Sequence, residues 1–115
     1  MTRSTTMLSS KIKQVIAIDG TVSHYHWCSG CCTLHRVVLV DPSGTGPIWG
    51  YNGKPETPSY TPSVKVTFSD PDGEFPSDIC HYFLRDGAVE YLSDCTHHLK
   101  GTTMPLQDIP PEWQS

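Results

Sequence analysis

The chain has 115 residues, which is enough for one domain and too few for two ordinary ones. Its 37% hydrophobic and 17% charged residues indicate a modest core, which a metal cross-link would help to stabilise. A net charge of −4, without any block of basic residues, excludes nucleic-acid binding driven by the phosphate charge.

The amino-terminal sequence and the cysteines predict the compartment. Residues 1–10 are polar and lack the apolar run of about 7–15 residues that marks a signal peptide. No segment approaches the ~18 apolar residues that a membrane-spanning helix needs. The five cysteines are an odd number, and in a reducing compartment a Cys-x-x-Cys pair favours metal or redox chemistry over disulfides. We therefore expect a soluble protein of the cytoplasm that does not bind membranes.

Short apolar or alternating segments, separated by turn residues, predict the fold. We expect a flexible arm over residues 1–11, the folded domain over 12–103 and an extended proline-rich tail over 104–115. Strands are predicted at residues 15–18, 21–27, 33–40, 48–51, 64–68, 79–84 and 88–92. The predicted fold is a mostly β, small single domain of about seven short strands in hairpins, cross-linked by one zinc ion.

The strongest motif is Cys28-Ser29-Gly30-Cys31. Two cysteines separated by two residues form a tight loop that directs both sulfurs to one point, as a tetrahedral zinc site requires. One such pair supplies only half of the site. The other half must come from elsewhere in the chain.

Two further groups of candidate ligands lie downstream, Cys80-His81 and Cys95-Thr96-His97-His98. Because side chains alternate along a strand, Cys80 and His81 point to opposite faces and do not bind the same ion. The hairpin that follows returns His97 to the neighbourhood of Cys80. We therefore predict a zinc site made of Cys28, Cys31, Cys80 and His97. The alternatives for the fourth ligand are Cys95, His98 and His35.

Several zinc chemistries are excluded. A nucleobase deaminase needs a His-x-Glu ahead of its Cys-x-x-Cys, and no glutamate precedes Glu56. The sequence has no His-Glu-x-x-His helix, which excludes a zincin. The predicted flanks of the cysteine pair are strands, whereas a thioredoxin-like site would open a helix.

These motifs resemble a family of small zinc-binding proteins of unknown function. The family is encoded by phages and prophages, occurs in bacterial operons with ubiquitin-like conjugation genes, and is often mislabelled "ammonia monooxygenase". The matching segments are Cys28-Ser29-Gly30-Cys31, His35, Trp49-Gly50-Tyr51-Asn52-Gly53, Pro58-Ser59-Tyr60-Thr61-Pro62-Ser63, Cys80-His81-Tyr82-Phe83 and Asp94-Cys95-Thr96-His97-His98-Leu99-Lys100-Gly101.

The resemblance covers residues 27–106 and has consequences for the site. It supports His97 over His98 as the fourth ligand and implies no ligand role for Cys95. Serine replaces the proline of the family's cysteine loop at Ser29, a change that removes no ligand. The association with conjugation operons implies a peptidase-like role.

The polar residues left after the zinc ligands are assigned support two functions. A histidine beside an aspartate and a hydroxyl is the arrangement that activates a nucleophile, so Ser63, His81 and Asp94 form a candidate catalytic triad. A second enzyme version uses an open zinc site with a bound water. Contacts of about 3.2 Å among the three side chains would favour a hydrolase.

The other function is a zinc-containing protein-interaction module, and this is the main interpretation of the sequence. The module would bind a host or phage protein through an aromatic surface of Trp49, Tyr51 and Tyr60. The polar residues near His97 would then orient that ligand. The sequence does not predict an oligomeric state.

Overall fold

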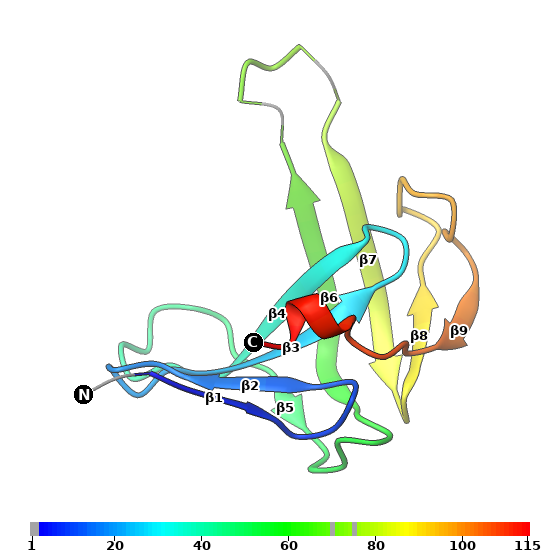
Figure 1. The fold of residues 1–115 in the computed structure, drawn as a ribbon. Coiled ribbons are helices and arrows are strands. Elements are labelled where there is room, and N and C mark those ends of the chain that lie inside the picture. The colour runs from blue at the N-terminus through cyan, green and yellow to red at the C-terminus, as the bar shows by residue number, and fades with distance from the viewer. Residues whose placement is uncertain (1–2, 70, 75) are drawn as a thin grey trace.

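Two antiparallel β-sheets make up the computed structural model, which describes residues 3–69, 71–74 and 76–115 (Figure 1). The first sheet has the strand order β1-β2-β3-β4 and the second has the order β5-β6-β7-β8-β9. The strands are β1 Ser4–Met7, β2 Lys13–Ile16, β3 Val22–Cys28, β4 Thr33–Val40, β5 Gly50–Tyr51, β6 Tyr60–Phe68, β7 Asp78–Arg85, β8 Ala88–Tyr91 and β9 Thr103–Pro105. The predicted mostly β class is confirmed.

The turns follow the chemistry of their residues. The two-residue loop Asp86-Gly87 joins β7 to β8, with Arg85 paired to Ala88. Asp86 and Gly87 both have positive φ, at 49° and 76°, as the turn that matches the twist of a β-hairpin requires. The long β6–β7 hairpin projects beyond the rest of the second sheet, at the top of Figure 1.

Both ends of the chain are more structured than the sequence predicts. Residues 4–7 of the predicted arm form β1, which pairs with β2, while Met1 and Thr2 lie outside the described residues. In the predicted tail, β9 pairs with β8 and the side chains of Leu106 and Ile109 are buried. These pairings raise the strand number among the described residues above the predicted seven.

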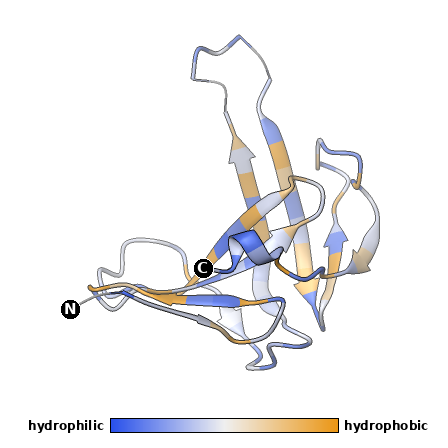
Figure 2. Ribbon diagram, in the orientation of Figure 1, coloured by the Kyte–Doolittle hydropathy of each residue, from blue (hydrophilic) through white to orange (hydrophobic). Residues whose placement is uncertain are grey.

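The core lies between the two sheets and takes residues from both. Val37 of the first sheet packs in one cluster with Val64, Tyr82 and Leu84 of the second. Hydrophobic and hydrophilic residues alternate along several strands, as expected for sheets with one buried face (Figure 2). Among the described residues, no helix is long and apolar enough to cross a membrane.

Histidines and tyrosines form a polar layer inside this core. His24, His26 and His35 are all buried on the first sheet. His24 contacts the Tyr60 hydroxyl through Nδ1, at 2.7 Å, and the Gln14 Oε1 atom through Nε2, at 2.9 Å. His26 and His35 both contact the Tyr82 hydroxyl. Hydrogen bonds between the sheets therefore accompany the apolar contacts. The sheets must pack in the one arrangement that satisfies these buried hydrogen bonds.

Candidate functional site

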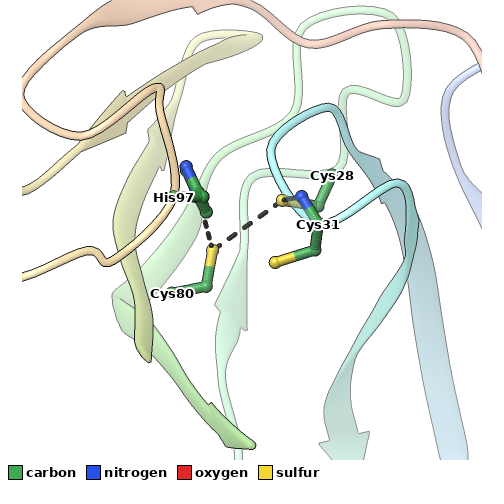
Figure 3. Close-up of side chains that lie close together, drawn as sticks. All are labelled: Cys28, Cys31, Cys80 and His97. Carbon is green, nitrogen blue, oxygen red and sulfur yellow. Dashed lines mark hydrogen bonds between the residues drawn. The ribbon is translucent and has the colours of Figure 1, made fainter. Parts of the chain in front are cut away.

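Four side chains from distant parts of the chain meet at one point between the sheets (Figure 3). Cys28 is the last residue of β3, Cys31 lies in the turn to β4, Cys80 lies on β7, and His97 follows β8. Their ligand atoms all lie within 4.8 Å of one another. Cys28, Cys31, Cys80 and His97 are thus close enough to bind a metal ion, and they are the four residues that the sequence predicts.

The turn between β3 and β4 presents the Cys28 and Cys31 sulfurs inward, whereas Cys32 is exposed. The Cys32 N–H donates to the Cys28 carbonyl at 2.8 Å, and the Cys31 N–H lies 3.3 Å from the Cys28 sulfur. Gly30 lies directly under the His97 ring, where an added Cβ atom would come within 2.3 Å of that ring. Only glycine therefore allows the loop to approach His97 this closely.

The spacing of the ligand atoms fits a tetrahedral ion. Bond lengths of about 2.3 Å to sulfur and about 2.05 Å to nitrogen separate two sulfurs by ~3.8 Å, and a sulfur from a nitrogen by ~3.6 Å. The Cys28 and Cys80 sulfurs lie 3.7 Å apart, and the Cys80 sulfur lies 3.4 Å from His97 Nε2. Three sulfurs with one imidazole are a donor set typical of structural metal sites.

The electrostatics of the thiols also point to a cation. A hydrogen bond with Cys80 lowers the pKa of Cys28 to about 4. Burial, together with the charge of the Cys28 thiolate, raises the pKa of Cys31 to about 12. Three thiolates this close together would repel one another, and a bound cation removes this penalty by compensating their charge.

The alternative fourth ligands lie elsewhere. His98 is exposed, and His35 is buried with its Nδ1 atom 3.0 Å from the Tyr82 hydroxyl. The Cys95 sulfur bonds to the backbone of His81. Among the described residues, His97 is the histidine that joins the three cysteines.

A second constellation lies on the other face of β7. His81 Nε2 is 3.1 Å from Ser63 Oγ, and His81 Nδ1 is 3.0 Å from Asp94 Oδ2. Because the Asp94 carboxylate only accepts, Nδ1 carries the proton, and Nε2 is left free to accept from the serine hydroxyl. This hydrogen bond lowers the pKa of Asp94. The three predicted residues therefore lie within hydrogen-bonding distance in the order of a catalytic triad.

An irregularity in β6 positions Ser63. Tyr60 pairs with Leu84 and Val64 pairs with Tyr82, so three residues of β6 lie opposite one residue of β7. Such bulges redirect side chains and are common beside active sites. The Trp49 indole N–H also donates to the Ser63 carbonyl, at 3.3 Å. The sequence predicted the serine but neither the bulge nor the role of Trp49.

The turn after β8 holds Asp94 over His81. The Cys95 N–H donates to the Leu92 carbonyl, and the Cys95 sulfur lies 3.1 Å from the His81 nitrogen and 3.0 Å from the His81 oxygen. Thr96 then bonds to Ile79 through its backbone N–H and its hydroxyl. Before Asp94, the Leu92 N–H donates to the His81 carbonyl, so the turn is fastened to β7 on both sides of Asp94. Sequence reasoning missed Cys95 because its position was considered only for metal binding.

The other residues singled out from the sequence belong to turns or to the core. Asn52, from one of the matching segments, closes a surface turn, where its side chain contacts Thr57 and Lys54. Tyr60 cannot belong to the predicted aromatic contact surface, because its side chain is 1% exposed and packs in the core. Tyr51 stacks on the Tyr60 ring and is half-buried.

Comparison with known proteins identifies the family. The family model described as "bacterial ubiquitination-like system serine protease (BubE)" matches residues 3–92. The chain belongs to the BubE family. The match includes Ser63 and His81 and agrees with the predicted link to ubiquitin-like operons; the phage origin stays a prediction. Searches of curated proteins and of solved structures find no match to this BubE-family chain.

Proposed function

We propose that this protein is a serine protease that cleaves amide bonds of ubiquitin-like proteins. Ser63 is the nucleophile, His81 is the general base, and Asp94 orients His81. The observation that carries the proposal is the continuous chain of contacts from Ser63 Oγ through His81 to Asp94. The family description supports the reaction class and the ubiquitination-like setting. It also favours the hydrolase over a purely binding module.

The chemistry follows from the positions of the three side chains. Ser63 Oγ attacks the scissile carbonyl carbon while its proton passes to His81 Nε2. His81 then gives this proton to the leaving amine, and the acyl group stays on Ser63 as an ester. A water molecule, deprotonated by His81, attacks the ester; the carboxylic acid leaves, and His81 returns the proton to Ser63 Oγ. Asp94 stabilises the imidazolium that forms in both steps.

The proposed metal is zinc, held by Cys28, Cys31, Cys80 and His97. When bound, zinc would supply charge compensation for the thiolates and a cross-link between the two sheets. Four protein ligands complete a tetrahedral shell and leave no position for a water, so the open-site mechanism has no support in this geometry. Cys80 and His81 also point to opposite faces of β7. We therefore assign zinc a structural role.

The triad is tested with Ser63→Ala and with Ser69→Ala as the matched control. Ser69 lies just beyond β6 and is exposed. The assays are labelling by a fluorophosphonate, hydrolysis of p-nitrophenyl acetate, and cleavage of a bacterial ubiquitin-like protein with a C-terminal extension. We expect the parent and Ser69→Ala to be active in all three, and Ser63→Ala to lose about 10³-fold or more.

A parent protein that is metal-loaded and folded, but neither labels nor cleaves, would contradict the protease proposal and leave the interaction module in place. Labelling of a serine other than Ser63, located by mass spectrometry of the labelled peptide, would contradict the assignment of the nucleophile. Metal analysis of the same preparations tests zinc independently. Stoichiometric zinc that survives Ser63→Ala is the expected result.

A further inference from the structure

The edge of β6 next to Ser63 is unpaired over most of its length. In the second sheet, β5 pairs only with Tyr60 and Thr61, whereas β7 pairs with β6 as far as Phe68. Among the described residues, Lys65 and Thr67 are therefore paired with a strand on one side only. Both are exposed. In Figure 1 the upper part of β6 has β7 on one side and no strand on the other.

The contacts of β7 tell which backbone groups face this free edge. The His81 carbonyl accepts a hydrogen bond from the Leu92 N–H, and the Ile79 carbonyl accepts one from the Thr96 N–H. His81 and Ile79 therefore direct their backbone groups away from β6. Their partners across the ladder are Lys65 and Thr67. In an antiparallel ladder, two directly opposed residues either both direct their N–H and C=O groups toward each other or both direct them away.

Lys65 and Thr67 thus direct both their N–H and C=O groups to the open side. The Ser63 carbonyl, two residues before Lys65, has the same direction, because it accepts from the Trp49 indole. The edge therefore offers the N–H and C=O groups of Lys65 and of Thr67. The candidate nucleophile, Ser63, lies two residues before Lys65 on the same strand. Where the ladder would continue, Trp49 and the bulge stop it at Ser63.

We propose that the substrate segment on the acyl side of the scissile bond adds to this edge as an extra antiparallel strand. This inference rests on the proposed protease function. An antiparallel segment runs from Thr67 toward Ser63, so its C-terminal carbonyl reaches the serine. Its fifth and third residues before the scissile bond pair with Thr67 and Lys65, respectively. The substrate class is an extended C-terminal tail, of the kind that strand addition recognises through main-chain bonds.

This pairing predicts that sensitivity to the loss of a substrate N–H group alternates along the substrate, with a period of two residues. The N–H groups of the third and fifth substrate residues point to β6, whereas that of the fourth points away. The probe is an acetylated hexapeptide coumarinyl amide with the tail sequence of a bacterial ubiquitin-like protein. Methylation of the third or fifth amide nitrogen should lower kcat/KM about tenfold, as expected for one lost hydrogen bond plus the steric block. Methylation of the fourth should change it little.

A variant of the protein tests the same edge from the other side. Thr67→Pro removes one outward donor without removing a bond to β7, and proline is accepted at strand edges. Thr67→Ala removes the side chain and keeps the donor. We expect Thr67→Pro to lower kcat/KM for the hexapeptide about tenfold relative to Thr67→Ala. Thermal unfolding of both variants reports whether each is folded.

The outcomes separate the edge from the protease itself. If the unmethylated hexapeptide is cleaved and methylation at the third, fourth and fifth positions is equally harmless, the strand addition is wrong and the protease stands. Sensitivity at the fourth position alone would also overturn this register. If neither the hexapeptide nor p-nitrophenyl acetate is hydrolysed by Ser63, both proposals fall. Should Thr67→Pro fail to fold, the methylated peptides still decide the question.

Discussion

Cys80 and His81 are adjacent on β7, and their side chains point to opposite faces of the second sheet. Cys80 is buried in the metal cluster, while His81 bonds to Ser63 and Asp94 on the other face. The turn after β8 repeats this relationship, since Asp94 belongs to the candidate triad and His97 to the metal cluster. The two sites therefore share the same two segments of backbone, and loss of one ligand should disturb the other site.

Metal removal should abolish activity because the fold that positions the triad depends on the metal. In Cys80→Ser the cluster loses a thiolate, and we expect loss of bound metal and a fall of several kcal/mol in the free energy of unfolding. His81→Ala, the neighbouring variant, should keep the metal and lose activity. Metal analysis, thermal unfolding and p-nitrophenyl acetate hydrolysis check both variants. An active, folded Cys80→Ser protein without metal would contradict the structural role.

Asp94→Asn should lower kcat without changing the fold. An amide can donate to His81 Nδ1 and so favour the tautomer with the proton on Nε2, which cannot accept from Ser63. We expect kcat to fall by about 10²–10⁴-fold. Because Asp94 is half-exposed, its side chain adds little to stability. A variant with parental kcat would show that Asp94 does not orient the base.

Cys95 is predicted to be a positioning residue for His81. Its sulfur contacts both the nitrogen and the oxygen of the His81 backbone and is buried. Cys95→Ser keeps a donor and an acceptor at this position, whereas Cys95→Val keeps only bulk. We expect Cys95→Val to lower kcat about tenfold or more with KM unchanged, and Cys95→Ser to restore most of it. Equal kcat in the two variants would indicate a packing role only.

Gly30→Ala should weaken metal binding. An alanine Cβ at this position would meet the His97 ring, so either the loop or the ring has to move. We expect the affinity for zinc to fall by about tenfold or more, the size of effect that misplacing a ligand produces. Ser29→Ala, in the same loop, is the control. Competition with a chromogenic chelator measures both, and parental affinity in Gly30→Ala would refute the close contact.

Stability should fall in mild acid because of His24. Burial lowers the pKa of His24 from its ordinary 6.5 to about 4. Between these values the unfolded chain binds more protons than the folded one, so the free energy of unfolding falls as the pH is lowered through this window. From pH 7 to pH 5 this group contributes a loss of about 2 kcal/mol.

The variant His24→Gln isolates this contribution. Its side chain does not titrate, so denaturant unfolding should depend less on pH than in the parent, by that amount. Both proteins carry the same thiols, and acid release of metal therefore cancels in the comparison. An identical pH dependence in parent and variant would mean that His24 keeps its ordinary pKa when folded.

Local sequence rules predicted part of both candidate sites, and the family resemblance supported His97 as the fourth ligand. Two cysteines around Ser29-Gly30 predict a turn with converging sulfurs, and strand alternation places Cys80 and His81 on opposite faces. Asp86-Gly87 predicts the hairpin that brings the turn after β8 back to β7. These rules depend on residues a few positions apart, and so a sequence without a structure is enough to apply them.

Only the tertiary structure decided how the segments meet. The bulge of β6 places Ser63 on His81, although alternation alone cannot say how β6 and β7 are aligned, because the register depends on packing across the sheet. The contacts of Cys95 with the His81 backbone and of Trp49 with Ser63 join residues far apart in the chain. Residues 4–7 of the arm and the first residues of the tail form strands because neighbouring strands supply partners for their backbone groups, which is information that lies outside those segments.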